Sequence, residues 1–262
     1  MKKPLRLKRF AKFLLRRLNG DRPPVDEPTT GPQCPICGSR RFGDFRNRVG
    51  VRCVGCGSFE RSRLLWMVLN QIDLTPGNRP FFHVAPEIGI ARRLHERLGS
   101  SYRAFDFSPE IYERVGLPVA RLDLCQDLHE LTADSIGGIC HVHVLEHVRC
   151  DAKAVLRQIN RVIAPGGYHV FGVPFWGHRY REDMSPTLTD ADRLSRFGHE
   201  DHVRAFGARD FMEHFGDAFE GMEPVPLPGL VDPGTAIHAN VPQRALAPLN
   251  THHIFVYRKL TR

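Results

Sequence analysis

The chain has 262 residues, of which 42% are hydrophobic and 25% are charged. This composition excludes a disordered or collagen-like chain and is ample for one full-size domain with an appendage. Residues 1–20 carry eight of the 37 basic residues and no acidic one, which leaves 29 basic against 29 acidic residues in the rest. Because the body is neutral, broad coating by nucleic acid is not expected.

The N-terminal residues 1–20 are predicted to form a basic amphipathic helix, with its apolar side chains within residues 5–18. Such a helix can lie on an anionic membrane surface, dock on its own domain or a partner, or remain a frayed tail. Charges interrupt what would be the continuous apolar segment of a signal peptide, and no small-residue cleavage site follows, so the segment is not predicted to be one. No apolar run in the chain is long enough to span a membrane as a helix. Residues 21–33 are rich in Pro, Gly and Asp and are predicted to be a linker.

Residues 34–60 contain two C-x-x-C pairs, Cys34/Cys37 and Cys53/Cys56, with fifteen residues between them. Each pair is followed by a glycine, which permits the tight turn that points two thiolates at one ion. Two such turns predict a zinc-ribbon-like segment with four sulfur ligands for a structural Zn²⁺. This pattern favours a reducing, cytoplasmic compartment over a disulfide framework, and a redox dithiol is the alternative. The other cysteines are predicted to be buried small apolar side chains: Cys125, Cys140 and Cys150.

From residue 61 to residue 262, helical and strand patterns alternate, which predicts an α/β domain with a mainly parallel, Rossmann-like sheet. Helices are predicted at 62–72, 88–98, 152–163 and 208–216. Strands are predicted at 81–85, 102–107, 119–124, 136–144, 168–173, 219–226 and 251–258. The segment 175–206 is too polar for a core, and as a long loop after the fifth strand it is predicted to lie over the site.

Ligands of such sheets bind at the carboxyl ends of the strands. The first strand leads into Pro86 and Glu87, and no glycine-rich phosphate loop follows it. Asp106 ends the second strand, at the spacing expected for a carboxylate that binds ribose hydroxyls, and Asp123 ends the third, facing an adenine edge. Because Glu87 would repel a pyrophosphate, the site suits a phosphate-free nucleoside with a cationic amino group, such as S-adenosylmethionine.

Five stretches carry a resemblance to a known family: CPICGS at 34–39, CVGCGSFERSRLL at 53–65, HVAPE at 83–87, HVLEHV at 143–148 with RVIAPGG at 161–167, and ED…RFGHEDHVRAFG between 182 and 207. Together they resemble the class I S-adenosylmethionine-dependent methyltransferases (methyltransferase type 11-like), in particular a bacterial subgroup with an N-terminal zinc-ribbon-like segment. The resemblance covers roughly residues 34–220. One departure is Ile136-Gly137, where the family usually has Phe-Asp before the fourth strand.

The resemblance implies a seven-stranded sheet with an antiparallel last strand and a site at its carboxyl edge. The residues it assigns to the cofactor are Ala85, Pro86, Glu87, Asp106, Asp123, Leu124 and His143. It places His143 and His147 beside the transferred methyl group. Since a neutral histidine can take a proton from an alcohol or amine acceptor, His143 and His202 are the candidate bases, with Asp183 as orienter.

The first functional hypothesis is a methyltransferase for a small-molecule or glycan acceptor, held near the inner face of the membrane by residues 5–18. The second is an RNA methyltransferase that grips phosphates through an arginine-rich zinc segment. The arginines in question are Arg40, Arg41, Arg46, Arg48, Arg52, Arg61 and Arg63. The third is a partner-binding module of the same fold that has lost the cofactor.

Overall fold

The computed structural model describes residues 29–261, so the predicted basic helix and most of the predicted linker lie outside the described residues. Within this range, none of the helices combines the length and the apolar character needed to cross a bilayer.

A seven-stranded sheet forms the centre of the molecule, in the order β10-β11-β7-β6-β3-β4-β5. The strands are β3 (Phe81–Val84), β4 (Tyr102–Asp106), β5 (Val119–Arg121), β6 (Ile136–Val142), β7 (Ile163–Gly172), β10 (Met222–Pro224) and β11 (Phe255–Lys259). The last strand, β11, pairs antiparallel with both β7 and β10, while β5, β4, β3, β6 and β7 pair in parallel. The predicted mostly parallel sheet with an antiparallel last strand is therefore confirmed.

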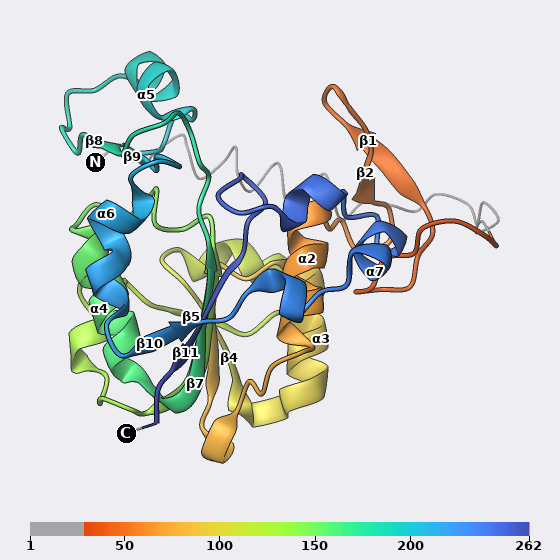
Figure 1. The fold of residues 1–262 in the computed structure, drawn as a ribbon, viewed down its shortest axis with the longest axis horizontal. Helices are drawn as coiled ribbons and strands as arrows, with labels where there is room; N and C mark the ends of the chain where they lie inside the picture. Colours follow the sequence, from red (N-terminus) through yellow and green to blue (C-terminus); the bar gives the residue numbers. More distant parts are fainter. Residues whose placement is uncertain (1–28, 262) are drawn as a thin grey trace.

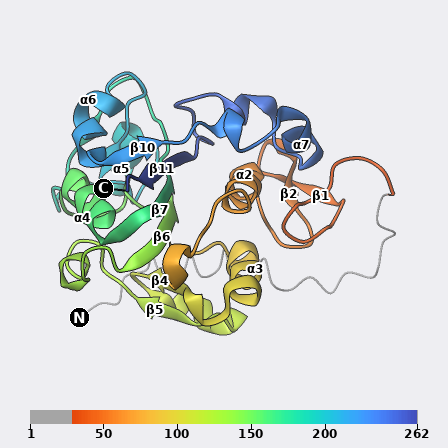
Figure 2. The same cartoon turned by 60° about the horizontal axis from the view of Figure 1, so that its bottom comes forward.

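Helices cover both faces of this sheet, which gives three layers (Figures 1 and 2). One face carries α4 (Ala152–Val162) and the short α6 (Phe211–Phe215), and the other carries α2 (Glu60–Leu69) and α3 (Ile88–Leu98). Helix α4 begins because the Asp151 side chain accepts hydrogen bonds from the amides of Lys153 and Ala154. Its buried residues recur every three or four positions and so form one apolar face against the sheet.

The start of β7 differs from the prediction, which ended the helix at residue 163 and began the strand at residue 168. Strand β7 begins at Ile163, and its register against β6 shifts between the pairs Ile136–Ile163 and Gly138–Tyr168. A Cβ atom on Gly167 would lie 2.4 Å from the Gly137 carbonyl oxygen. The glycine therefore allows a bulge in which two strand backbones approach more closely than any side chain permits.

Gly137 and Gly138 disfavour a strand by propensity, yet both lie within β6. A Cβ on Gly137 would lie 2.9 Å from the Leu74 carbonyl oxygen, so this glycine makes room for the connection before β3. A Cβ on Gly138 would lie 2.8 Å from the Tyr168 carbonyl oxygen of β7. Both glycines lie at the amino end of β6, and the predicted site residue His143 follows its carboxyl end. The position that lacks the family's usual carboxylate is thus about 20 Å away along the strand from that end.

The cysteine segment packs directly on the main domain instead of standing apart. Its hairpin is β1 (Phe42–Phe45) and β2 (Arg48–Cys53), beside α2 and α7 (Pro233–His238) (Figure 2). Trp66 Nε1 donates to the Pro35 carbonyl at 2.9 Å, and Arg93 Nε donates to the Ile36 carbonyl at 2.8 Å. Buried residues of this segment, including Cys34 and Cys53, share one hydrophobic core with α2 and α3.

The segment after β7 folds over one end of the sheet (Figure 1). It contains β8 (Arg181–Glu182), α5 (Asp190–Phe197) and β9 (Arg204–Ala205), and we call residues 175–206 the lid segment. Helix α5 was not predicted because it is largely exposed, although a capping box of Thr189 and Asp192 marks its start. Gly198, with φ of 80°, ends it.

Candidate active site and metal centre

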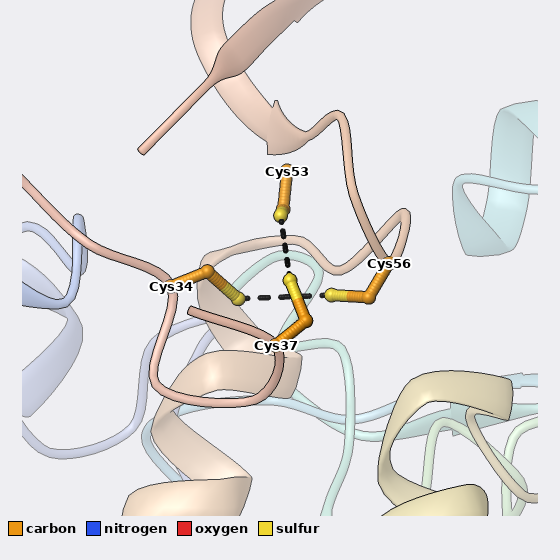
Figure 3. A group of neighbouring side chains, drawn as sticks. All are labelled: Cys34, Cys37, Cys53 and Cys56. Carbon is orange, nitrogen blue, oxygen red and sulfur yellow. Dashed lines mark hydrogen bonds between the residues drawn. The ribbon is translucent and has the colours of Figure 1, made fainter. Parts of the chain in front are cut away.

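The four predicted zinc ligands converge on one point (Figure 3). The sulfur pairs Cys34–Cys56 and Cys37–Cys53 are 3.6 and 3.5 Å apart, and all four sulfurs lie within 4.8 Å of one another. Four sulfurs at about 2.3 Å from a tetrahedral Zn²⁺ are separated by roughly 3.8 Å, so the spacing fits that ion. No other metal-ligating groups are needed to complete a closed structural site.

Local backbone geometry explains this convergence. Gly38 and Gly57 adopt φ of 80° and 74°, and their amides donate to the carbonyls of Cys34 and Cys53. These two turns fold each pair into a knuckle. A Cβ on Gly55 would lie 3.1 Å from the Cys37 sulfur, so a larger residue at this position would press on the metal-binding turn.

At the carboxyl end of β3, the chain turns at Ala85 and Pro86 into helix α3. Ala85 has φ of 52°, a left-handed conformation that is costly for a residue with a Cβ. Glu87 Oε2 lies 3.0 Å from His83 Nε2, and the other ring nitrogen of His83 lies 3.0 Å from the Tyr102 hydroxyl. These contacts fix the Glu87 carboxylate at the edge of the sheet.

Arg61 of α2 reaches the same edge and was not predicted to belong to the cofactor site. Its Nη1 lies 3.3 and 3.2 Å from the two ring nitrogens of His143, and its Nε is enclosed without a hydrogen-bond partner. Burial lowers the pKa of Arg61, and the charges of Glu87 and Glu146 oppose that shift. His143 follows β6 with φ of 57°, and burial, together with Arg61, holds its pKa well below the usual value.

Asp106 lies half-buried at the carboxyl end of β4, beside β3. Its Oδ1 accepts from the Ser108 amide at 2.8 Å and its Oδ2 accepts from the Tyr112 hydroxyl at 3.0 Å. Burial raises its pKa, and these two hydrogen bonds oppose the rise. The next residue, Phe107, is 62% exposed, and the Arg121 guanidinium lies 5.2 Å from its ring centroid. The spacing of residues in the sequence did not predict this exposed aromatic ring next to a half-buried carboxylate.

Asp123 follows β5 on the far side of β4. Its Oδ1 accepts from the Cys125 amide at 2.9 Å, while its own amide donates to the Asp127 carboxylate at 2.7 Å. Leu124 is 6% exposed and packs into the core beneath this turn. The carboxyl edge therefore carries Glu87, Asp106 and Asp123 on three neighbouring strands, in the order expected from the sequence.

A second cluster of polar groups lies between the loop after β6 and the lid segment. Glu146 is fully buried and neither carboxylate oxygen has a hydrogen-bond partner. Burial raises the pKa of Glu146 to about 8. His147 and His202 lie beside it, with ring centroids 4.8 Å apart, and burial lowers the pKa of His202 to about 4.

The predicted pairing of Asp183 with His202 is not among the observed contacts. His202 Nδ1 lies 3.1 Å from the Phe197 carbonyl, so this carbonyl orients the ring. Asp183 accepts from Arg196 at 2.8 Å and from the Ser185 amide at 2.9 Å, both within the lid segment. Asp183 thus shapes the lid segment, and an orienting role toward His202 finds no support in its contacts.

Arg204 fastens the lid segment to the loop after β6. Its side chain is fully buried and donates to the carbonyls of Leu145, Val148 and Cys150. It also pairs with Glu182 at 3.0 Å. A buried arginine with four acceptors has a structural role. The polar sequence of this region did not show whether Arg204 would contact a substrate or hold the fold together.

The expectation for two cysteines was wrong. Cys125 and Cys150 form a disulfide, and Cys125 is exposed, whereas Cys140 is fully buried as predicted. The bond joins the loop that holds Asp123 to the loop that holds Glu146. Twenty-five positions separate the two cysteines, and β3 and β4 lie between the strands β6 and β5 in the sheet. Only the tertiary fold brings the two loops together, so no spacing rule could have found the bond.

The matches to known proteins agree with this geometry. Residues 83–171 match the family model described as a methyltransferase domain. This stretch runs from β3 to β7 and contains Ala85, Glu87, Asp106, Asp123 and His143, so the resemblance to methyltransferases inferred from the sequence is confirmed. No protein of curated function matches the chain.

Among solved structures, an S-adenosylmethionine-dependent methyltransferase from Mesorhizobium loti is 15% identical, with a TM-score of 0.47 and coverage of 76% of this chain and 96% of that one. The 1,6-didemethyltoxoflavin-N1-methyltransferase of Burkholderia thailandensis, with bound S-adenosylhomocysteine, is 15% identical at a TM-score of 0.43, covering 76% and 78%. The YcgJ protein of Bacillus subtilis is 13% identical at a TM-score of 0.43, covering 76% and 98%. At these identities and TM-scores, the similarities support no conclusion about function.

Proposed function

We propose that the chain is an S-adenosylmethionine-dependent methyltransferase that acts on a small-molecule or glycan acceptor. The observation that carries this proposal is the pair of opposite charges at the carboxyl edge. Arg61 presents an enclosed Nε without a partner, and Glu87 is the nearby charge with the largest effect on it. An α-amino acid group has one carboxylate and one ammonium, so this pair is complementary to the methionine end of the cofactor.

The remaining edge residues fit the nucleoside. Asp106 can accept from ribose hydroxyls, because a carboxylate has more lone pairs than its two present hydrogen bonds use. The exposed Phe107 ring offers a face for adenine, with Asp123 beyond it on β5. Glu87 in place of a glycine-rich loop opposes a diphosphate at this position.

When bound, the cofactor supplies an electrophilic methyl group on a sulfonium. The residues of this chain then align the acceptor and remove its proton where the acceptor is an alcohol or amine. His143 is held neutral by burial and by Arg61, and His202 has a pKa of about 4, so both present unprotonated nitrogens at neutral pH. His143 lies closer to the proposed methionine end and is the preferred proton acceptor.

The acceptor class is inferred from the contacts that the basic residues already make. Among the arginines of the zinc segment and α2, Arg63 is fully buried with hydrogen bonds to the carbonyls of Ala239, Ser58 and Asn240, and Arg48 is paired with Glu60. Arg61 belongs to the cofactor edge. Fewer guanidinium groups are therefore available for an RNA backbone than the sequence suggests, which favours a small acceptor.

Calorimetry with S-adenosylmethionine tests the proposal. The wild-type chain is expected to bind one equivalent, and Arg61→Met is expected to bind about 10- to 100-fold more weakly, the value of a charge-assisted hydrogen bond. Arg103→Met, which changes an exposed arginine of β4, serves as the matched control and should bind as wild type. A folded wild-type chain that gives no binding heat would contradict the proposal and favour the non-catalytic module.

Contact with a membrane surface is a separate proposal, because residues 5–18 lie outside the described residues. The basic residues at 1–20 are the feature that supports it. Deletion of residues 1–20 should abolish co-sedimentation with anionic liposomes and leave cofactor binding unchanged. Equal sedimentation of both forms would contradict the membrane role.

A further inference from the structure

The buried carboxylate of Glu146 is the least satisfied group in the described part of the chain. Both of its oxygens are enclosed without a hydrogen-bond partner. The nearest bases are His143 Nδ1 at 3.5 Å and His147 Nε2 at 3.9 Å. Arg61 and Arg204 influence it only through their charge. A native fold rarely encloses a carboxylate in this way unless a ligand completes it.

Two histidines close to this carboxylate each keep one nitrogen that is free to bind an ion. His202 Nδ1 lies 3.1 Å from the Phe197 carbonyl, and only a protonated nitrogen can donate to a carbonyl, so Nε2 keeps its lone pair. His147 Nδ1 lies 3.5 Å from the Asp201 carboxylate, which leaves its Nε2 on the side of Glu146. This is the arrangement by which outer carbonyl and carboxylate groups orient histidines that bind a metal.

The potential ligand atoms of Glu146, His147 and His202 lie within 4.8 Å of one another. Bonds of about 2.1 Å at tetrahedral angles place two ligand atoms about 3.4 Å apart on one ion, so the ligand atoms have to approach one another by roughly an ångström to close the site. His147 is on the exposed side, with a side-chain exposure of 38%, which provides both the freedom to move and a route of entry.

We propose that Glu146, His147 and His202 bind a divalent transition-metal ion, a site separate from the four cysteines. Two imidazoles and one carboxylate form a donor set suited to Zn²⁺, Fe²⁺ or Co²⁺, and they leave coordination positions open to water or an oxygen ligand. Asp201 is a positioning residue, because its carboxylate contacts both His147 and His199. The ion bridges the loop after β6 and the lid segment. This inference does not depend on methyltransferase activity.

Metal content provides the first test. The wild-type chain, loaded with Zn²⁺ and freed of excess by gel filtration, is expected to hold two zinc ions by mass spectrometry of the elements. His202→Asn should hold one, since an Asn amide can still donate to the Phe197 carbonyl but has no second nitrogen to bind the ion. His129→Asn, an exposed histidine outside the cluster, is the control and should hold two. One ion in the wild type, or two in His202→Asn, would overturn the proposal.

A second measurement uses the wild-type chain alone and avoids any question of misfolding. Titration with Co²⁺ should give one equivalent with intense sulfur-to-metal charge-transfer bands from the cysteines, followed by a second with weak visible bands only. Asp201→Asn should weaken the second equivalent about 10- to 100-fold, the usual effect of losing an outer partner of a metal-bound histidine. The absence of a second saturable equivalent would overturn the site.

Discussion

The two ends of the parallel sheet differ in how completely their groups are satisfied. At the amino end, Gly137, Gly138 and Gly167 bring backbones so close that an added Cβ would lie 2.4–2.9 Å from a carbonyl oxygen. At the carboxyl end, Ala85 and His143 hold left-handed conformations, and polar atoms of Arg61 and Glu146 have no hydrogen-bond partner. One end is optimised for packing, and the other retains strain and unpaired polar groups. Such costs persist where a ligand requires them.

The largest expected effect comes from disturbing the packed end. Gly167→Ala places a Cβ against the Gly137 carbonyl and should lower the free energy of unfolding by about 3 kcal/mol, the upper range for overpacking. Urea unfolding measures this loss. Gly229→Ala is the matched control, because an added Cβ there has nothing within 4 Å, and its effect should stay within about 0.5 kcal/mol. Equal effects would show that the amino end is not tightly packed.

At the carboxyl end, a substitution should affect binding rather than folding. Asp106→Asn removes the charge proposed to bind the ribose and should weaken S-adenosylmethionine binding by about 1.5–3 kcal/mol, or roughly 10- to 100-fold. The free energy of unfolding should change little, because burial raises the pKa of this carboxyl and already opposes its charge. Glu110→Gln, an exposed acid nearby, is the control for calorimetry. A stability loss with unchanged affinity would assign Asp106 to the packing of the turn.

Between the two ends, β6 and β7 carry a buried histidine pair that should make the fold acid-sensitive. His141 Nε2 and His169 Nε2 are 2.9 Å apart, and His169 Nδ1 lies 2.7 Å from Asn160 Oδ1. Burial lowers the pKa of His141 to about 3, and that of His169 falls as well. Below the unfolded pKa of about 6.5, the unfolded state binds protons that the folded state does not, so stability falls as the pH falls.

For His141 this linkage amounts to about 2 kcal/mol between pH 6.5 and pH 5, at about 1.4 kcal/mol per pH unit. Urea unfolding at pH 7 and pH 5 measures the loss. His141→Leu should reduce the pH dependence by that amount, whatever its effect at pH 7. An unchanged slope would show that His141 accepts a proton within the folded chain.

The strained backbone of Ala85 should give a small effect on stability, opposite in sign to that of a helical alanine. Ala85→Gly removes the left-handed strain at the carboxyl end of β3 and should raise the free energy of unfolding by about 0.5–1 kcal/mol. The same change at Ala91, within helix α3, should lower it by about 1 kcal/mol or more. Thermal unfolding of both variants gives the two signs. A loss at Ala85 would mean that its conformation is not strained.

Periodicity and local spacing in the sequence were enough to predict the elements of the sheet and most of the residues at its carboxyl edge. The seven strands, the four cysteines and the acids after β3, β4 and β5 lie where apolar patterns and fixed spacings placed them. In each case the signal is local: a cysteine pair in one turn, or a carboxylate at the end of a strand or within three residues after it. The partners of those residues were harder to predict, because they come from other parts of the chain.

The features that the sequence did not predict all depend on contacts between distant parts of the chain. The Cys125–Cys150 disulfide, Arg61 beside His143 and Arg204 beneath the loop after β6 all join segments that only the tertiary fold brings together. Gly137 and Gly138 have low strand propensity, and β6 contains them because neighbouring backbones lie too close to leave room for a Cβ atom. Helix α5 is short and largely exposed within a segment of polar sequence, and its amphipathic pattern and capping box are the signals that could have marked it.

A crystal structure with bound S-adenosylmethionine would show directly whether the carboxyl edge of the sheet holds the cofactor. We expect the methionine carboxylate within hydrogen-bond distance of Arg61, the ammonium group near Glu87 and the ribose hydroxyls on Asp106. Adenosine bound away from the ends of β3 and β4, or a ligand whose diphosphate occupies the Glu87 turn, would contradict this placement.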